Sequence, residues 1–414
     1  MSTRKEKIPI VRFRAFSEPW FQNQLSEVAE FSKGRGYSKK DIQPQGTPII
    51  LYGRLYTKYE SVISNIDTYA NMEKNSVISE GGEVIIPASG ESSAEISRAS
   101  CVTDGGVILG GDINIVKPHE SLDSSFIAIT LSNGSQQREL SKRAQGKSVV
   151  HLHNSDLKAV KLFYPSYEEQ FAIGSLFHTL DDLLVSYKDN LANFQSLKAT
   201  MLSKMFPKAG HTVPEIRLDG FEGEWEVQTL KELARFSKGN GYTKNDLVNS
   251  GKEIILYGQL YTNYQTVISK VNTFVTTVKA NAVISKGGEV IVPASGESAE
   301  DISRASVVEK SGIILGGDLN IIYPDGKKVD SIFLALTISN GSQQKELIKR
   351  AQGKSVVHLR NNDLEKVILH YPSMEEQQAI GAYFSNLDNL INSHQEKISQ
   401  LEILKKKLLQ DMFI

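Results

Sequence analysis

The feature that most constrains this chain of 414 residues is an internal repeat, in which the second half follows the first at an offset of 205 to 207 residues. FSKGRGY at 31–37 returns as FSKGNGY at 236–242, and RAQGKSVVHL at 143–152 returns without a change at 350–359. In another matched pair, GGEVIIPASGESSAEISRAS and GGEVIVPASGESAEDISRAS, 16 of 20 positions are identical. We therefore expect the chain to fold as two copies of one unit.

The first part of each copy, about 165 residues, is a series of short apolar, β-branched runs separated by Gly, Pro, Asn and Asp. VIIPAS and GVILGG are such runs in the first copy, and EVIVPAS and GIILGG are their counterparts in the second. This pattern predicts strand-rich globular domains over residues 1–165 and 208–372. Short helices are expected within them at 136–144 and 343–351, where basic residues recur three to five positions apart.

The end of each copy has a different composition. Residues 167–206 and 374–413 contain no Pro and one Gly each, and their apolar residues recur every three or four positions. This spacing predicts one long helix over 166–207 and another over 373–414, each with an apolar seam close to a heptad repeat. The seam residues are Leu180, Leu184, Tyr187, Leu191, Phe194, Leu197, Met201 and Met205 in the first helix and Leu387, Ile391, His394, Ile398, Leu401, Leu404, Leu408 and Met412 in the second.

Each long helix needs a partner. A lone helix of about 40 residues would be about 60 Å long and would leave its apolar seam in water, so the other long helix is expected to cover it. The first helix carries the chain from one globular domain to the other, and antiparallel pairing would bring the second helix back to the first domain. The sequence thus predicts an α+β fold in which two similar strand-rich domains, inverted relative to each other, are joined by two long helices. These helices form an antiparallel coiled coil with pseudo-two-fold symmetry.

Composition limits the functions open to such a chain. The net charge is −1, from 47 Lys and Arg against 48 Asp and Glu, so strong DNA binding by the chain alone is not expected. The single cysteine, Cys101, aligns with Val307 and is expected to be a small packing residue. One Cys and a start, MSTRKEKIPIV, without an apolar leader favour a protein of the reducing cytoplasm. No apolar run approaches the roughly 20 residues of a membrane-spanning helix.

Motifs of enzyme chemistry are missing from the sequence. AQGKS, present in both copies, contains the Gly-Lys-Ser of a phosphate loop, but Ser141 and Ile348 stand where that loop needs its first Gly. A histidine pair would exist in one copy only, because His153 aligns with Arg360, so no metal site is predicted. The chain also lacks an NPPY-type methyltransferase motif and an obvious cluster of nuclease carboxylates. An enzyme acting alone, such as a nuclease or an ATPase, is therefore not expected.

What remains is a set of side chains suited to surface recognition. Cations, aromatics and glycines alternate near the start of each copy, and this mixture can hold phosphates and contact base edges. A solvated strand face with packed tyrosines is the alternative interpretation. The candidates are Lys33, Arg35, Tyr37, Arg54, Tyr56, Lys58 and Tyr59 in the first copy and Lys238, Asn240, Tyr242, Gln259, Tyr261 and Asn263 in the second.

Two further groups of candidates follow along each copy. The PASGES loops could accept a hydrogen bond from a cytosine amino group through Glu91 or Glu297, or could form a buried turn in which the carboxylate pairs with Arg98 or Arg304. A run of basic residues on each short helix could contact phosphates or could be an ordinary charged helix face. These basic residues are Arg138, Lys142, Arg143 and Lys147 in the first copy and Lys345, Lys349, Arg350 and Lys354 in the second.

Both copies open and close with the same short motifs, P-x-x-R-[FL] followed by a Trp and then YPS-x-EEQ-x-AIG at the entry to the long helix. The residues are Pro9, Arg12, Phe13, Trp20, Pro165, Glu169, Gln170 and Ile173 in the first copy and Pro214, Arg217, Leu218, Trp225, Pro372, Glu376, Gln377 and Ile380 in the second. Over its whole length the chain resembles the DNA-specificity subunit of type I restriction-modification systems. The P-x-x-x-EQ-x-x-I entry to each long helix is the most specific part of that resemblance.

The resemblance implies a division of labour. Each globular domain would be a target recognition domain that reads one half of a bipartite DNA site, and the paired helices would fix the gap between the halves. The helices would also dock two modification subunits, which in this family methylate adenine N6 with S-adenosylmethionine. Restriction subunits can join that complex and cleave DNA with ATP and Mg. The chain itself would bind no cofactor and catalyse no reaction, and double-stranded DNA would be its ligand.

The similarity of the two copies departs from the usual pattern of the family, in which the two recognition domains differ strongly. Two inverted copies of one reader predict a near-palindromic target, with three to five specified base pairs per half-site and half-sites about one helical turn apart or more. Arg35 aligns with Asn240, and since Arg favours guanine whereas Asn favours adenine, one or two positions per half-site could differ. Tighter phosphate contacts in the first copy are the alternative explanation of this difference. A stand-alone DNA-binding regulator with two domains on a rod is the alternative function.

Overall fold

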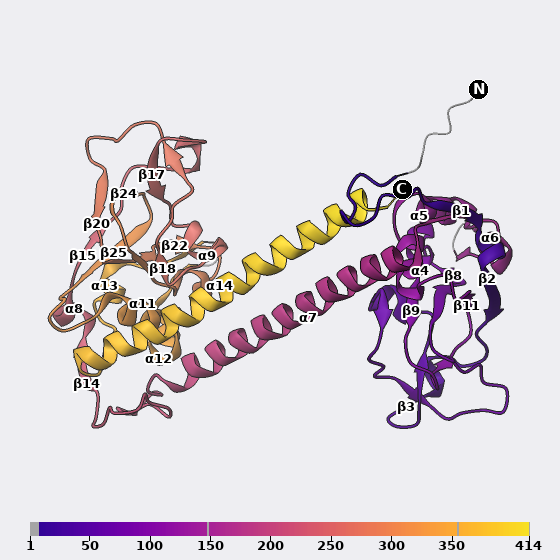
Figure 1. The fold of residues 1–414 in the computed structure, drawn as a ribbon. Coiled ribbons are helices and arrows are strands. Elements are labelled where there is room, and N and C mark those ends of the chain that lie inside the picture. The colour runs from indigo at the N-terminus through magenta and orange to yellow at the C-terminus, as the bar shows by residue number, and fades with distance from the viewer. Residues whose placement is uncertain (1–7, 147–148, 354–355, 414) are drawn as a thin grey trace. The chain divides into compact units, whose positions relative to one another are not determined.

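The chain folds into two compact units, each built from strands, short helices and parts of two long helices. The computed structural model describes residues 8–146, 149–353 and 356–413 (Figure 1). Unit 1 comprises Met1–Lys188 together with Glu396–Ile414, and unit 2 comprises Asp189–Gln395. The α+β class expected from the sequence is confirmed.

The main sheet of unit 1 has five strands in the order β2-β11-β7-β9-β5, antiparallel except where β5 pairs with β9. All five residues of its central strand β7 are buried, because the sheet separates two apolar cores. Val84 and Ile86 belong to the core that contains helix α4, and Ile85 belongs to the core on the other face. The elements are β2 (Ala29–Lys33), β5 (Val62–Ile63), β7 (Glu83–Pro87), β9 (Ser100–Val102), β11 (Ile113–Pro118) and α4 (Ser124–Leu131).

A smaller sheet of unit 1 has four strands in the order β10-β4-β6-β3, and two strand pairs, β1-β13 and β12-β8, complete the unit. These strands are β1 (Phe21–Gln24), β3 (Ile42–Gln43), β4 (Thr47–Ile50), β6 (Tyr69–Ala70), β8 (Ser89–Gly90), β10 (Ile108–Leu109), β12 (Val150–His151) and β13 (Lys161–Tyr164). The short helices are α1 (Leu25–Val28), η1 (Lys39–Asp41), α2 (Arg54–Thr57), α3 (Ser93–Ile96), α5 (Gly134–Arg143) and α6 (Asn154–Lys158).

Unit 2 repeats this topology. Its main sheet has the order β15-β25-β21-β23-β18, its smaller sheet has the order β16-β19-β17-β24-β20, and β14-β27 and β22-β26 are strand pairs. The strands are β14 (Glu226–Thr229), β15 (Ala234–Lys238), β16 (Leu247–Val248), β17 (Lys252–Ile255), β18 (Val267–Ile268), β19 (Phe274–Val275), β20 (Val283–Lys286), β21 (Glu289–Pro293), β22 (Ser295–Gly296), β23 (Ser306–Val308), β24 (Ser311–Leu315), β25 (Leu319–Pro324), β26 (Val357–His358) and β27 (Ile368–Tyr371). The helices are α8 (Leu230–Leu233), η2 (Lys244–Asp246), α9 (Gln259–Thr262), α10 (Ala299–Ile302), α11 (Ser331–Ser339), α12 (Gly341–Arg350) and α13 (Asn361–Leu364).

The expected helices are present, and the long ones pair antiparallel within each unit. Helices α5 and α12 confirm the short helices, and α7 (Tyr167–Lys204) and α14 (Met374–Asp411) confirm the long ones. In unit 1, Asp181 pairs with Lys405, and Lys188 pairs with Glu402 at 2.8 Å. In unit 2, Lys198 pairs with Asp388, and the rings of Phe194 and His394 are 5.2 Å apart. In each unit, residue numbers rise along one helix as they fall along the other.

The predicted seam is wrong at one equivalent position in each helix. Leu197 and Leu404 are 41% and 45% exposed, and the neighbouring Lys198 and Lys405 occupy the half-buried places instead. Each lysine pairs with an aspartate of the facing helix, so an ion pair replaces an apolar contact there. A heptad pattern could not reveal this, because it does not include the partners that a lysine finds in the other helix.

The motif residues at the ends of each copy hold the long helices to the globular domains. Arg12 donates from Nε and Nη2 to the two carboxylate oxygens of Glu169, both at 2.7 Å, and the Glu169 side chain is 1% exposed. Arg217 and Glu376 make the same bidentate pair in unit 2, at 2.7 and 2.6 Å. Such pairs fix both position and orientation, so the start of each long helix is locked onto its domain.

The glutamine of the same motif adds a second attachment. Gln170 accepts a hydrogen bond from the backbone N–H of Asp123 at 3.0 Å and donates to the carbonyl oxygen of Pro165 at 3.0 Å. Gln377 accepts from Asp330 and donates to Pro372 in unit 2, at 2.9 Å in both cases. The glutamine therefore ties the helix start to the loop that begins α4 or α11.

The end of α14 completes the core of unit 1. The ring of Phe413 stacks on Phe126 at 5.9 Å between centroids and lies 5.8 Å from Phe177. The backbone N–H of Val11 donates to the carbonyl oxygen of Asp411 at 2.9 Å. Chain segments from both ends of the sequence therefore form one core in this unit.

Candidate nucleic-acid interface

Lys33 and Arg35 flank a position that only glycine can occupy. A Cβ on Gly34 would lie 1.9 Å from the carbonyl oxygen of Gly110, which is closer than any side chain tolerates. The N–H of Arg35 donates to the carbonyl oxygen of Leu109 at 3.1 Å. Both cations are exposed. The backbone is thus held by close packing while the two charged groups extend into solvent.

Unit 2 repeats this loop with one cation fewer. A Cβ on Gly239 would lie 1.9 Å from the carbonyl oxygen of Gly316, and Lys238 and Asn240 on either side are exposed. The amide of Asn240 donates from Nδ2 to the carbonyl oxygen of Asn281 at 3.3 Å. The scaffold is therefore shared, and the side chains on it differ.

Tyr37 and Tyr242 hold neighbouring loops of their own units. The hydroxyl of Tyr37 donates to the carbonyl oxygen of Asn71 at 3.0 Å and accepts from the N–H of Glu73 at 2.9 Å. The buried Tyr242 accepts from the N–H of Lys279 at 2.6 Å, and the ammonium of Lys279 lies 4.4 Å from its ring centroid. Tyr37 and Tyr242 are therefore packing residues with internal hydrogen bonds, as in the alternative interpretation of a strand face with packed tyrosines.

Arg54 and Gln259 also make internal contacts. Arg54 donates to Glu60 and to Asp67, both at 2.7 Å, and its side chain is 9% exposed. Gln259 accepts from the N–H of Leu256 at 2.9 Å and donates to Thr273 at 2.8 Å. Each of these residues begins a short helix, α2 or α9, and fastens it to the neighbouring strand region.

The structure brings tyrosines and carboxylates together in both units. The rings of Tyr52 and Tyr56 are 6.2 Å apart, and those of Tyr257 and Tyr261 are 6.3 Å apart. Burial raises the pKa of Tyr56, and so, to a smaller extent, do the neighbouring Tyr52 and the negative charge of Glu91.

In unit 2, burial likewise raises the pKa of Tyr261, followed by the effects of Tyr257 and Glu297. Both phenols stay protonated at neutral pH. An exposed carboxylate acceptor, Glu91 or Glu297, therefore lies beside phenol donors in each unit.

Lys58 and Asn263, the last candidates of this region, are exposed at the ends of α2 and α9. Lys58 forms an ion pair with Asp67 at 3.0 Å, and both side chains are more than half exposed. An exposed pair of this kind contributes little to stability, so the ammonium can exchange its partner for a phosphate. Its counterpart Asn263 has no charge to offer.

Arg98 and Arg304 stack on aromatic rings. The guanidinium of Arg98 lies 5.2 Å from the ring centroid of Tyr59, and that of Arg304 lies 5.5 Å from the ring centroid of Tyr264. Among the described residues, no ion pair joins either arginine to a PASGES carboxylate. The buried Arg–Glu turn, the alternative proposed for this loop, is therefore absent from that part of the chain.

The basic residues of α5 and α12 divide into two kinds. Arg143 pairs with Glu139 at 2.9 Å and Arg350 with Glu346 at 2.6 Å, each one turn away on the same helix. The other basic residues of these helices are exposed, and Lys147 and Lys354 lie outside the described residues. The exposed residues are Arg138, Lys142, Lys345 and Lys349.

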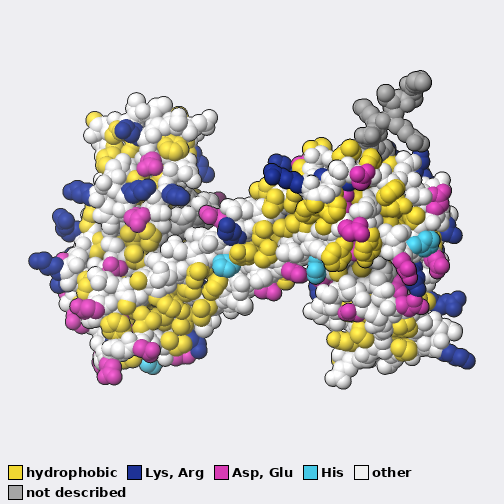
Figure 2. Space-filling model, in the orientation of Figure 1, with side chains coloured by type: hydrophobic (Ala, Val, Ile, Leu, Met, Phe, Trp, Pro, Cys, Tyr) yellow, Lys and Arg dark blue, Asp and Glu magenta, His cyan; other side chains and the backbone are white. Residues whose placement is uncertain are grey.

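Charge is dispersed over the surface. On the face shown in Figure 2, Lys and Arg side chains lie singly among acidic ones rather than in one continuous patch, in keeping with the net charge of −1. Within the described residues, no group of three or more His, Cys, Asp or Glu could hold a metal ion, and no helix is both long and apolar enough to cross a membrane. Cys101 packs in the core, where burial raises its thiol pKa to about 12, which confirms its expected role as a packing residue.

Several polar residues that no sequence motif indicated lie around a pocket beside Tyr59 and Arg98. Asn133 and Gln137 come from the start of α5, and Lys405 comes from α14. Their signal in the sequence is identity between the copies, since Asn340, Gln344 and Lys198 stand at the equivalent positions. That signal carries no information about which residues meet, so only the fold could group them.

Known proteins that are similar to this chain in sequence and known proteins that are similar in fold belong to the same kind of subunit. The family model for the type I restriction modification DNA specificity domain matches this chain twice, at residues 17–193 and 222–403. The type I restriction enzyme MjaVIII specificity subunit of Methanocaldococcus jannaschii is 20% identical over 407 residues, which cover 95% of this chain and 91% of that protein. The crystal structure of the type I restriction-modification S subunit from M. genitalium has a similar fold, with a TM-score of 0.63, 15% identity and 99% of each chain covered.

The two matched segments fall on the two copies of the repeat and together span most of the sequence. Each segment includes the globular domain of one copy and most of the long helix that follows it. The resemblance of the opening and closing motifs thus extends over the complete fold. The chain belongs to the type I restriction-modification DNA specificity family, as a subunit that recognises DNA and is not itself an enzyme.

Proposed function

We propose that the globular domains of unit 1 and unit 2 are two target recognition domains that read the halves of one near-palindromic DNA site. The observation that carries this proposal is the matched placement of the same side chains in both units. Lys33 and Lys238 end equivalent strands, and Glu91 and Glu297 lie beside equivalent tyrosine pairs. Base recognition depends on the position of donors and acceptors, so matched surfaces favour similar half-sites.

The roles of the candidates follow from their surroundings. The exposed Lys33, Arg35, Lys58 and their counterparts are proposed to contact phosphates or base edges, and Glu91 and Glu297 to accept from cytosine amino groups. The internally bonded candidates are proposed to position the exposed ones. These positioning candidates are Tyr37, Arg54, Arg143, Tyr242, Gln259 and Arg350.

We infer that α7 and α14 act as the spacer between the two half-sites. The antiparallel pairing of the two helices within each unit supports this role. Half-sites about one helical turn apart, or somewhat more, would then face the two domains. Domain limits of 1–165 and 208–372 are proposed for the two readers.

Two adenine-N6 methyltransferase subunits are the proposed partners, and they would bind the S-adenosylmethionine. Restriction subunits using ATP and Mg would join them where the system has such subunits. The exposed Leu197 and Leu404 support two equivalent docking positions, since each is an apolar side chain at the same place in one of the two helices. Catalytic partners would also supply phosphate contacts that a chain of net charge −1 lacks.

The proposal is tested by co-expression with the modification subunit followed by sequencing of the methylated bases. We expect N6-methyladenine in a motif made of two inverted, similar halves around an unspecified spacer. A strongly asymmetric motif would contradict the near-palindromic target.

A gel shift separates the proposed subunit from a stand-alone regulator. The chain alone is expected to bind the methylated motif weakly and non-specifically, and specific binding is expected after the modification subunits are added. Tight, sequence-specific binding by the purified chain alone would favour the regulator.

A further inference from the structure

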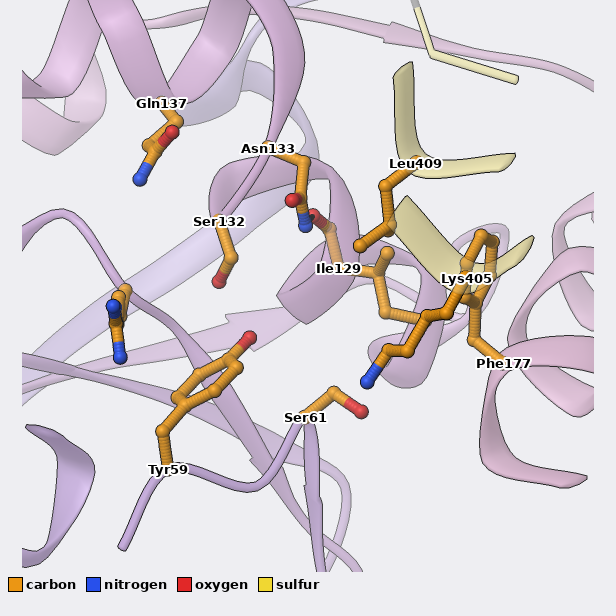
Figure 3. A pocket seen from close by; sticks show the side chains of 10 residues that line it. Tyr59, Ser61, Ile129, Ser132, Asn133, Gln137, Phe177, Lys405 and Leu409 are labelled. Atoms are coloured by element: carbon orange, nitrogen blue, oxygen red, sulfur yellow. Dashed lines mark hydrogen bonds between the residues drawn. The ribbon is translucent and has the colours of Figure 1, made fainter. Parts of the chain in front are cut away.

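A pocket of about 260 Å³ in unit 1 lies where the globular domain meets both long helices (Figure 3). The domain contributes residues from the loop before β5, the segment that follows α3, helix α4 and the start of α5. Helices α7 and α14 close the other side with Phe177 and Leu409. The polar residues that line it are Tyr59, Arg98, Ser132, Asn133, Gln137 and Lys405.

Two cations line this pocket, and only one of them is neutralised. Lys405 pairs with Asp181, whose other carboxylate oxygen accepts a hydrogen bond from Ser61 at 2.8 Å. Arg98 lies over the ring of Tyr59 and forms no ion pair with any described residue. The pocket therefore has one uncompensated positive charge in a partly enclosed place, where electrostatic interactions are stronger than in open solvent.

Neutral donors surround that charge. Asn133 and Gln137 lie one turn apart at the start of α5, where the helix dipole is positive. One N–H of the Asn133 amide donates to the carbonyl oxygen of Ile129 at 2.8 Å, and an amide has a second N–H to give. Burial raises the pKa of Tyr59, so its hydroxyl stays protonated and can donate. A guanidinium, an ammonium, a phenol and side-chain amides together form a site for a small anion rather than for a cation or an apolar ligand.

The residues that line this pocket are nearly the same in the two copies, whereas several exposed candidates differ. Of the ten residues that line it, eight are identical at the equivalent positions of the second copy. The other two change conservatively, from Ser61 to Thr266 and from Ile129 to Leu336.

The contacts recur in unit 2 as well. Arg304 stacks on Tyr264, Lys198 pairs with Asp388, and Thr266 donates to Asp388 at 3.5 Å. Burial raises the pKa of Tyr264, so its hydroxyl stays protonated and can donate, as that of Tyr59 does in unit 1.

We propose that this pocket and its counterpart in unit 2 each bind one phosphate group. A guanidinium binds phosphate oxygens through two parallel hydrogen bonds, and the pocket has room for one phosphate group. Phosphate binding by the pocket does not depend on the proposed function, but the origin of the phosphate does. In a complex on DNA the ligand is a backbone phosphate, and otherwise it is inorganic phosphate.

Calorimetric titration of the full chain with inorganic phosphate tests the pocket. We expect two phosphates per chain, one per chain for Arg98→Gln or Arg304→Gln, and none for the double variant. Each lost site should weaken by about tenfold or more, since the hydrogen bonds removed involve two charged groups. Lys188→Gln, which removes an exposed cation of α7 that is not a candidate contact, is the control and should still bind two.

The proposal is wrong if the Arg98→Gln variant still binds two phosphates per chain. It is also wrong if the unaltered chain shows no saturable phosphate binding. Tyr59→Phe keeps the ring beneath Arg98 and removes only the hydroxyl, and it should weaken phosphate binding with an unchanged melting temperature. This second variant keeps the test valid if Arg98→Gln is poorly folded.

Binding to duplex DNA by the complex with modification subunits identifies the source of the phosphate. If the source is DNA, Arg98→Gln lowers affinity for all sequences by a similar factor and reduces the slope of log affinity against log salt by about one. An unchanged slope together with a lost phosphate in the titration assigns inorganic phosphate as the ligand and leaves the pocket confirmed. Failure of the unaltered complex to bind DNA would count against the proposed function alone, because the titration needs no DNA.

Discussion

Unit 1 and unit 2 share their main sheets strand for strand and differ in the smaller sheets beside the candidate recognition loops. The smaller sheet has four strands in unit 1 and five in unit 2. The fifth strand of unit 2, β20, pairs with β24, whereas unit 1 has only an isolated bridge between Ile78 and Ile108. The two units therefore share their main scaffold and differ beside the loops that carry the candidate recognition residues.

The same lesson holds for individual side chains. Unit 1 fastens α2 with the charged network of Arg54, Glu60 and Asp67, and unit 2 fastens α9 with the neutral amide of Gln259. Both sets of contacts hold an equivalent short helix, yet they give different electrostatic fields beside the loops that carry the candidate recognition residues. Variants at matched positions can therefore separate what the two units share from what distinguishes them.

The largest expected effect on stability concerns the Arg–Glu pair that both units share. Arg12→Ala and Arg217→Ala each leave a buried glutamate without its partner and should destabilise the affected unit by about 3–5 kcal/mol. Urea unfolding followed by hydrogen exchange in each unit measures the loss. Lys188→Ala, which removes an exposed ion pair, is the control and should cost less than about 1 kcal/mol. A large loss in one unit only would contradict their equivalence.

A somewhat smaller loss of stability is expected at Gly34 and Gly239, the glycines next to the exposed cations. Gly34→Ala and Gly239→Ala place a Cβ against a backbone oxygen and should each cost about 1–3 kcal/mol, because the loop must shift. Denaturant midpoints measure this cost. Gly326→Ala, where an added Cβ would meet nothing within 4 Å, is the matched control and should be nearly neutral. Equal losses at all three positions would show that close packing is not the cause.

Arg54→Ala and Gln259→Ala sharpen the difference between the units. We expect a stability loss of about 1–2 kcal/mol for Arg54→Ala, reduced by the exposure of Asp67, and about 1 kcal/mol for Gln259→Ala, which loses neutral hydrogen bonds. Each variant should relax base preference in one half-site only, because α2 and α9 carry Tyr56 and Tyr261. Methylation mapping with the modification partner measures this, and an unchanged motif would exclude Arg54 and Gln259 from recognition.

The smallest effect on stability is expected for Arg35→Asn, which makes the exposed loop of unit 1 like that of unit 2. Stability should change by less than about 0.5 kcal/mol, since the side chain is exposed. Discrimination at one base pair should shift by about 1–3 kcal/mol from guanine toward adenine, which makes the methylated motif more symmetric. Asn240→Arg is the reciprocal variant and should alter the other half-site.

Much of the fold could be predicted, because its main signals are long-range repetition and helical periodicity. The duplication fixed the number of similar domains, and the apolar spacing of the long helices required a partner. The motif residues Arg12 and Glu169 were visible as a pattern of the family. Their contact with each other was not, since 157 residues separate them.

The candidate surface was less predictable, because exposure and hydrogen bonding depend on residues distant in sequence. Tyr37 contacts a loop 34 to 39 residues away, so nothing near it shows that its hydroxyl is already used. Arg54 is surrounded by acidic residues at 60 and 67, and only the fold turns both toward it. Residue type and spacing identified the region but could not separate contacting residues from supporting ones.

The packing of Phe413 against Phe126 and Phe177 has a consequence for synthesis on the ribosome. Unit 2 is contiguous in sequence, from Asp189 to Gln395, and its core uses no described residue from outside that range. The domain made first must wait for the last residues of the chain before its own core is filled. The half of the molecule that is made first therefore needs residues from the far end of the sequence to complete its core.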